Sequence, residues 1–566
     1  MAQPLSLARG RMRIFSLSYV LPPFFVMMMG GALISLAAIL PLQGIGADDA
    51  LLSHGHAIFL APTHLLFSGQ AIRMILPLTA KTWRSNTIVS WRETGLMFCL
   101  FLNIFLLYLL ALYVLPRMVR LKYILISVFL LGLICMFIPV VTSSDVFSYI
   151  AYARIGVIYH HNPLTTWPAS IINDQIITYI YWVNQPSAYG PVWAIITSFL
   201  QWVLGLGSPA GILRMMMALR FLGLLMHLGS TFLIWSISGD LQRHRGWLSE
   251  ERRIRATLAF AWNPLLLFEA SVNAHVDATL LFFILLALWV MARCEQPSFR
   301  AYLVAGLLLA LTTCIKINVV LLAPALFIYL WKVRSWRFWR VLTIAGAYVG
   351  TIVVLYAPFW DKGHVLDVLK FNPATFRNIN SLPEFINRFY NALTFFNPVK
   401  LPYGAPSPSE HVTHTASMIL FALIYLVLCW VALRPGRVDT LPKLIGWMAV
   451  SWLLYCFIGS PWFWPWYLVT FLGLFAILES LHTDGWVSGM FKLPLAVRLL
   501  TFSGLTLYCF YTWGAIKTTL PGHPSFQMGF VRGLWMWLLP LFALRVPWKQ
   551  LANRTRKLLL RQRYVA

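Results

Sequence analysis

The sequence predicts an all-α membrane protein, a polytopic bundle of about 14 transmembrane helices with further juxtamembrane helices on its outer face. Hydrophobic residues make up 59% of the 566 residues and charged residues only 11%, and the mean hydropathy is +0.73. Soluble proteins carry about 25% charged residues. Apolar stretches close to the roughly 20 residues that cross a bilayer recur throughout the chain. The predicted spans cover residues 14–42, 94–115, 121–142, 210–237, 254–272, 276–294, 300–315, 317–332, 341–359, 414–434, 443–459, 466–481, 494–513 and 531–546.

The positions of Lys and Arg predict the orientation. Most of the 44 basic residues lie in the N-terminal segment, in short loops between the predicted spans and in the C-terminal tail. The positive-inside rule places these segments, and both termini, in the cytoplasm. A full crossing by the apolar segment 189–206 would move the five arginines between 240 and 255 outside, so we expect an interfacial or re-entrant helix there. The net charge of +26 therefore indicates contact with anionic membrane lipid and not with nucleic acid.

Four long segments face outward in this topology and contain most of the different polar residue types: residues 43–93, 143–209, 360–413 and 514–530. Asp145 is the most informative residue among them, since the chain has only 18 acidic residues. It follows the apolar run 121–142 directly, and ionisable groups at a membrane are costly and often functional. The alternative is that Asp145, with Ser143 and Ser144, only caps the next helix.

Other candidates also lie at predicted outer ends of spans. Asn273, His275 and Asp277 share one turn, Lys316 lies in the next, and Trp466 and Tyr467 belong to the aromatic string PWFWPWYL. Simpler interpretations exist for each group. The turn residues can cap helices, a lone Lys can reach the lipid headgroups, and Trp and Tyr commonly form an aromatic belt at the membrane surface.

Five strings occur in an order that carries a resemblance: SSDVFSYIAYARIGVIYHHNP, YGPVW, WNPLLLFEASVNAHVDA, KIN and PWFWPWYL. Together they resemble the integral-membrane glycosyltransferases of the GT-C fold, and in particular the bacterial mannosyltransferases that use polyprenyl-phosphate mannose. The resemblance extends over roughly residues 120–480. We therefore expect N-terminal spans and a first outer loop in residues 1–120, a catalytic core in 121–480, and C-terminal spans with a basic tail in 481–566.

The resemblance implies inverting transfer of a hexose, with mannose preferred, from a polyprenyl-phosphate donor to a glycan or glycolipid acceptor of the cell envelope. The reaction would take place on the extracytoplasmic face of the plasma membrane, with Asp145 as the general base. Some family members carry a second acidic residue nearby, whereas here the next is Asp174, which argues against a two-acid site. No metal-binding motif is present and no cofactor is expected, although a divalent cation is left open.

The chemistry of such a transfer suggests which residues take part. A sugar phosphate already has a good leaving group, so the enzyme needs a base for the acceptor hydroxyl and cations for the departing phosphate. The candidates for the donor phosphate or lipid are Arg154, His161, Lys316, Arg377, Trp466 and Tyr467. The candidates for the sugar and acceptor are Tyr149, His160, Asn162, Tyr189, Asn273, His275 and Asp277.

Two other classes of protein remain. A transporter or flippase of lipid-linked sugars would also be polytopic, but it should show broken spans in paired halves and ionisable residues at the bilayer centre. A glycan polymerase or ligase would share the donor chemistry and is harder to distinguish. The sequence contains no Walker or Rossmann glycine motif, so a nucleotide-driven reaction has no support.

Overall fold

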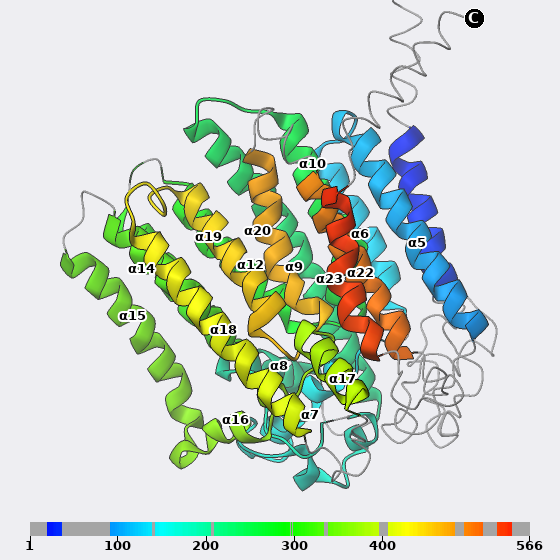
Figure 1. Cartoon of the computed structure of the whole chain (residues 1–566), viewed down its shortest axis with the longest axis vertical. Coiled ribbons are helices and arrows are strands. Elements are labelled where there is room, and N and C mark those ends of the chain that lie inside the picture. Colours follow the sequence, from blue (N-terminus) through cyan, green and yellow to red (C-terminus); the bar gives the residue numbers. More distant parts are fainter. Residues whose placement is uncertain are drawn as a thin grey trace, which may run out of the picture.

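The computed structural model describes residues 20–36, 91–138, 142–180, 182–204, 209–294, 296, 298–332, 338–394, 406–481, 492–512 and 529–545. Within these ranges the secondary structure is helical, apart from an isolated bridge between Ile379 and Trp462. Most long helices run side by side (Figure 1). The predicted all-α class is therefore confirmed. Of the predicted outer segments, residues 43–90 and 514–528 lie outside the described part.

The long helices form the body of the bundle. They follow a first helix at Val20–Leu36 and are α5 (Trp91–Val114), α6 (Leu121–Met136), α9 (Pro209–His244), α10 (Glu250–Ala261), α12 (Val276–Ala292), α13 (Phe299–Thr313), α14 (Ala323–Lys332), α15 (Phe338–Tyr356), α18 (Pro408–Leu433), α19 (Leu441–Leu454), α20 (Leu468–Leu481), α22 (Lys492–Thr512) and α23 (Gly529–Arg545).

Shorter helices lie between them and at their ends. These are α7 (Asp145–Val157), α8 (Pro191–Leu204), α11 (Pro264–Leu267), α16 (Val368–Phe371) and α17 (Leu382–Leu393), with 3₁₀ or π turns at Leu115–Arg117, Pro168–Ile171, Gln175–Tyr179, Phe268–Val272, Ile317–Leu322, Ala357–Phe359, Asp361–Asp367, Pro373–Thr375, Tyr455–Gly459 and Pro465–Tyr467.

Several helices can cross a membrane, which makes this a membrane protein. Among the described residues, five helices are long and apolar enough: Gly95–Arg117, Gly211–His244, Phe338–Phe359, Pro408–Leu433 and Leu441–Gly459. A sixth span results if Pro264–Val272 and Val276–Ala292, which meet at 110°, count as one. The other apolar helices have only 10–17 residues. Helices thus occur where the sequence predicts spans, but the predicted number of about 14 crossings is not confirmed.

One predicted span is interrupted for a reason visible in the sequence. The range 254–272 was expected to be continuous, but α10 ends at Ala261 and a new helix begins at Pro264. Asn263 caps this second helix, its side chain accepting from the Leu265 N–H at 3.1 Å. Proline fits the first turn of a helix and disrupts its interior, so the Asn-Pro pair sets the break here.

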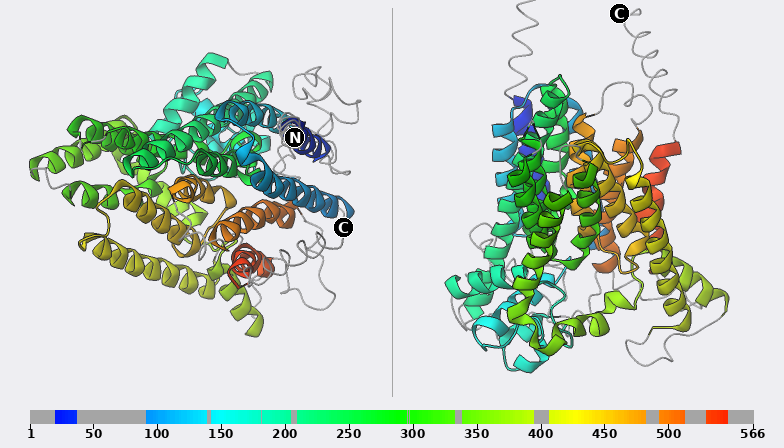
Figure 2. Two further views of the ribbon diagram at one scale, coloured as in Figure 1. Left: turned by 90° about the horizontal axis from the view of Figure 1, so that it is seen from above. Right: turned by 90° about the vertical axis from the view of Figure 1, so that its left-hand side faces the viewer.

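The shorter helices gather at one end of the bundle. In Figure 1 the labels of α7, α8, α16 and α17 lie at the lower end, and the side view in Figure 2 shows the same grouping. Helix α8 packs against α7 and α9 and exposes the apolar side chains of Phe199 and Trp202. It occupies the segment predicted to be interfacial or re-entrant, and the side of the membrane on which it lies stays a prediction.

A close contact with α9 fixes the position of the Phe268–Val272 turn. A Cβ atom on Gly223 of α9 would collide with the backbone carbonyl of Ala270. Glycine alone permits this approach. The contact fixes the turn that contains Glu269 against the core helix α9.

Candidate functional site

Asp145 is the first residue of α7. The N-cap position belongs to Ser144, whose side chain makes no capping hydrogen bond. The Asp145 N–H instead donates to Ser143 Oγ at 3.3 Å, and Tyr189 donates a long hydrogen bond of 3.4 Å to Asp145 Oδ2. Asp145 therefore does not act as the N-cap residue of α7, and its side chain keeps 16% of its surface exposed.

The turn at residues 273–275 brings a histidine to Asp145. It lies between the two bent helices, and Ala274 has a φ of 53°, a left-handed conformation that costs a non-glycine residue some energy. His275 Nε2 lies 3.9 Å from Asp145 Oδ2 and 3.1 Å from Ser143 Oγ. Residues that are 130 positions apart in the sequence thus meet at the start of α7.

Glu269 orients His275 from the other side. Its fully buried carboxylate accepts from His275 Nδ1 at 2.5 Å, from Asn273 Nδ2 at 2.9 Å and from the Tyr508 hydroxyl at 2.6 Å. Thr142 in turn donates to Asn273 Oδ1. Because Nδ1 faces a carboxylate, we assign the Nδ1 proton to His275, and this leaves Nε2 directed at Ser143 and Asp145.

A second charged pair lies next to this cluster. Lys316 Nζ lies 3.0 and 3.1 Å from the two oxygens of Asp277 and 4.3 Å from the centre of the Tyr467 ring. Asp277 is buried and Lys316 partly exposed. Lys316 is therefore not the lone lysine of the simpler interpretation, because its charge is held by a buried carboxylate and by an aromatic face.

Aromatic rings cover the histidine. The Trp466 ring stacks on His275 with 4.0 Å between ring centres, and Trp464 stacks on Trp466 at 4.8 Å and 10°. Trp466 is buried between these two rings, whereas Trp464 is partly exposed. Of the predicted residues, the structure thus brings together Asp145, Tyr189, Asn273, His275, Asp277, Lys316, Trp466 and Tyr467.

The tryptophan segment is held in place by residues 379–380. Ile379 N–H donates to Pro461 O at 2.8 Å, and Phe463 N–H donates to Ile379 O at 3.0 Å. The Asn380 side chain donates to Phe463 O at 3.0 Å. These bonds tie the loop before α17 to the turn that carries Trp464 and Trp466.

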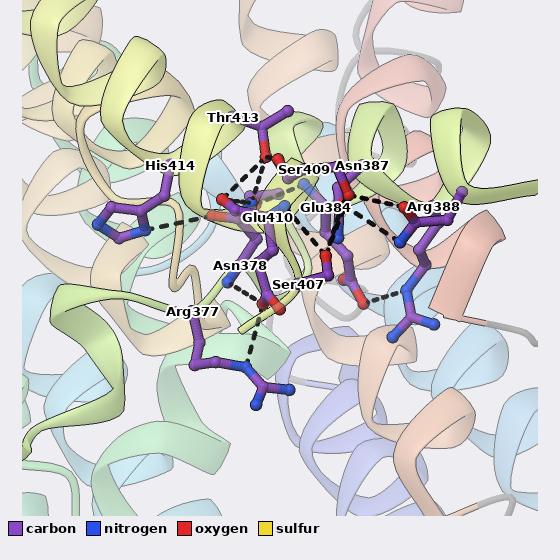
Figure 3. A network of polar contacts seen from close by, with 12 residues as sticks. Arg377, Asn378, Glu384, Asn387, Arg388, Ser407, Ser409, Glu410, Thr413 and His414 are labelled. Atoms are coloured by element: carbon purple, nitrogen blue, oxygen red, sulfur yellow. Dashed lines mark hydrogen bonds and ion pairs between the residues drawn. The ribbon is translucent and has the colours of Figure 1, made fainter. Parts of the chain in front are cut away.

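Figure 3 shows the polar network around this loop. Glu384 accepts from the Asn380 N–H at 2.5 Å and from Arg388 and Arg532 at 2.7 and 2.9 Å. Burial opposes its ionisation, but the charges of Arg532 and Arg388 and the hydrogen bonds from Arg388 and the Asn380 N–H together lower the pKa of the Glu384 carboxyl. Arg377, expected to bind a phosphate, donates to Glu410 at 3.1 Å in this network.

Other predicted residues lie elsewhere. Arg154 is buried and forms an ion pair of 2.8 Å with Asp174, an arrangement that favours a structural role over a contact with phosphate. His160 and His161 are exposed, and Asn162 donates to Phe359 O at 2.9 Å. Tyr149, in contrast, adjoins the cluster, because it packs edge-on against Tyr189 with 4.9 Å between ring centres.

The environment of Asp145 favours a basic carboxylate. Burial raises its pKa above the ordinary value for Asp, while the charges of His275 and Lys316 and the hydrogen bond from Tyr189 partly offset this effect. Burial and the nearby Asp145 charge also raise the pKa of Tyr189, which therefore stays a neutral donor. A carboxylate with a raised pKa takes up a proton more readily.

The two residues that sequence reasoning left out or unassigned are Tyr508 and Glu269. Tyr508 lies in α22, where an apolar run gives no local signal, and it reaches Glu269 only through the tertiary fold. Glu269 was visible as a charge within an apolar stretch, but its partners could not be read from the sequence. Within the described ranges no group of three or more His, Cys, Asp and Glu side chains is arranged to hold a metal ion.

A helical membrane protein with a carboxylate, a histidine, a lysine and stacked tryptophans at one end of its bundle has the features expected of a membrane-bound transferase. Residues 60–332 match the family described as MptA_B family alpha-(1->6)-mannopyranosyltransferase, N-terminal domain. The match confirms the predicted resemblance to membrane mannosyltransferases, and it includes Asp145, Glu269, His275 and Lys316. None of the curated proteins compared with the chain matches it.

Proposed function

We propose that this protein transfers a hexose, preferably mannose, from a polyprenyl-phosphate donor to a hydroxyl group of an envelope glycan or glycolipid on the extracytoplasmic side of the membrane. The family match supports mannosyl transfer. The observation that supports the site is the distance of 3.9 Å between Asp145 and His275, beside the Lys316 and Asp277 pair.

The proposed reaction is a single displacement. The acceptor oxygen forms a bond to the anomeric carbon, and the bond from that carbon to the phosphate oxygen breaks. The hydroxyl proton moves to the Asp145 carboxylate, and the electron pair of the broken bond leaves with the polyprenyl phosphate. The configuration at the anomeric carbon is inverted, as in any direct displacement at that centre.

The surrounding side chains have distinct proposed roles. Lys316 offsets the charge that builds on the phosphate, and the partly exposed Trp464 ring contacts the sugar. His275, oriented by Glu269, contacts a hydroxyl of sugar or acceptor beside Asp145. Each role uses a group that lies next to Asp145 in the structure.

The acid limb of the pH profile should lie at higher pH than for an ordinary aspartate, whose pKa is about 3.9. Burial raises the pKa of Asp145, and a protonated carboxyl cannot act as a base. Activity should therefore fall as the pH drops through this raised pKa. The measurement is kcat/KM for the donor against pH, with unfolding monitored in parallel. A profile flat down to pH 4 in the folded protein would contradict the assignment.

Replacing Lys316 by Gln should lower kcat/KM for the donor by about 10- to 100-fold, the usual worth of a hydrogen bond to a charged group. The variant leaves Asp277 buried beside an amide, so stability must be controlled. The double variant Lys316→Gln with Asp277→Asn removes that unpaired charge. If the double variant regained both stability and full kcat/KM, Lys316 would be structural only.

The proposed function is tested with purified protein in nanodiscs, labelled polyprenyl-phosphate mannose and a glycolipid acceptor. We expect labelled product of inverted anomeric configuration.

The alternative function, transport of lipid-linked sugars, is tested in proteoliposomes by the movement of the same lipid between leaflets. The described residues include one broken helix pair, at residues 264–292, a feature that transporters also show. The ionisable residues of this pair lie next to α7 at the end of the bundle. A transporter would hold such residues at the midplane of the membrane. Lipid movement without transfer would refute the proposal.

A further inference from the structure

Helix α17 has its polar side turned inward and its apolar side turned outward. The buried and half-buried stripe consists of Glu384, Asn387, Arg388 and Asn391. The outward stripe consists of Ile386, Phe389, Tyr390 and Leu393, which are 47%, 47%, 55% and 63% exposed. Both stripes follow the spacing i, i+3, i+4, i+7 of one helix face. A helix that packs on a protein core from water shows the opposite arrangement.

The inward stripe contacts neighbouring helices through Glu384, Asn387 and Asn391, and these contacts fix the orientation of α17. Ser409 Oγ donates to Asn387 Oδ1 at 2.5 Å and to Asn391 Oδ1 at 2.6 Å. Glu384 is paired with Arg388 and with Arg532 of α23. Figure 3 shows Asn387 directed toward Ser407 and Ser409, and Glu384 bonded to Arg388. The helix cannot rotate its apolar stripe inward without breaking these bonds.

The level of α17 along α18 indicates what covers the outward stripe. Helix α18 is one of the candidate spans, and α17 contacts its start, at Ser407 and Ser409. The exposed surface of α18 includes Val412, is polar or small at Thr415 and Ala416, and becomes continuously apolar from Met418 onward. Val412 and Met418 lie three and nine residues beyond Ser409, a rise of about 4.5 and about 13.5 Å along the helix, an interval that includes the roughly 5–10 Å over which in-plane helices enter a bilayer.

We infer that α17 is an in-plane membrane helix whose stripe of Ile386, Phe389, Tyr390 and Leu393 is inserted among the lipids of the membrane surface next to the site. The lipid chemistry required is an ordinary phospholipid headgroup and acyl-chain boundary. This inference does not depend on the proposed reaction. The sequence alone predicts only that residues 360–413 face outward, with Arg377 as a candidate for binding the donor phosphate.

The test is spin labelling of the full-length protein in phospholipid nanodiscs, with single cysteines at Ile386, Phe389 and Leu393. Leu423→Cys, on the exposed apolar side of α18, is the lipid control, and Arg437→Cys, in an exposed polar turn, is the water control. The signal of labelled protein without an added cysteine is subtracted, because Cys99 is exposed. Collision with oxygen and with a water-soluble nickel chelate is measured at each position.

We expect the three stripe positions to resemble Leu423→Cys, with a ratio of oxygen to nickel accessibility several-fold above that of Arg437→Cys. A ratio equal to the water control would show that the stripe faces solvent and would overturn the inference. Low accessibility to both reagents would show that protein covers the stripe, which would overturn it as well. Three independent positions guard against one substitution that fails to fold.

Discussion

Replacing Asp145 by Asn should lower the turnover of mannosyl transfer by about 10²- to 10⁴-fold, the range expected when a general base is removed. Asn keeps the shape of the side chain and can still accept from Tyr189, so donor KM should change little. The measurement is kcat and KM with purified protein in nanodiscs. Asp145→Glu, which keeps the charge but moves it, should retain a small part of the activity.

Stability provides the control for this variant. Burial raises the pKa of Asp145. At a pH above that pKa, the ionised carboxylate is therefore less favourable in the folded protein than in the unfolded chain. Removal of the charge should therefore leave the unfolding temperature at neutral pH unchanged or slightly higher. An Asp145→Asn protein that is stable and transfers mannose at the wild-type rate would end the assignment of Asp145 as the base.

Replacing Arg154 by Met should destabilise the protein by about 3–5 kcal/mol, because it leaves Asp174 as a buried carboxylate without its partner. The two side chains are 3% and 1% exposed, and Asp174 also accepts from the Tyr159 hydroxyl. The double variant Arg154→Met with Asp174→Asn should recover much of the loss. Thermal and SDS unfolding of the purified protein in micelles provide the measurement.

A surface pair serves as the matched control for this effect. Lys443 and Asp439 form an ion pair of similar length, 2.8 Å, with side chains 48% and 37% exposed. Lys443→Met should change stability by no more than about 1 kcal/mol. If Arg154→Met were as stable as wild type but bound the donor poorly, the phosphate-binding role expected from the sequence would be favoured over the structural one.

The helices were the most predictable part of the fold, because continuous apolar runs specify helices in a membrane protein with little ambiguity. Their ends were less predictable. The break at Asn263 and Pro264 follows from local chemistry and was still missed, since the apolar composition of 254–272 hides it. How many helices cross the membrane depends on packing and tilt, which composition does not determine.

The residues of the candidate site were also predictable only in part. Asp145, His275 and Lys316 were found because each is a costly ionisable group beside an apolar run. The roles of Glu269 and Asn380 depend on contacts with residues far along the chain, such as Tyr508 and Phe463. Arg154 was expected to face a ligand, yet its partner Asp174 lies 20 residues away, a pairing that no local pattern indicates.

A cryo-EM structure of the Asp145→Asn protein with polyprenyl-phosphate mannose and acceptor would show directly where the reacting sugar binds. We predict the acceptor oxygen at about 2.6–3.2 Å from the side chain of residue 145, the phosphate beside Lys316 and the sugar ring against Trp464. A donor bound at the opposite end of the bundle, near Arg243 and Arg293, would contradict the account.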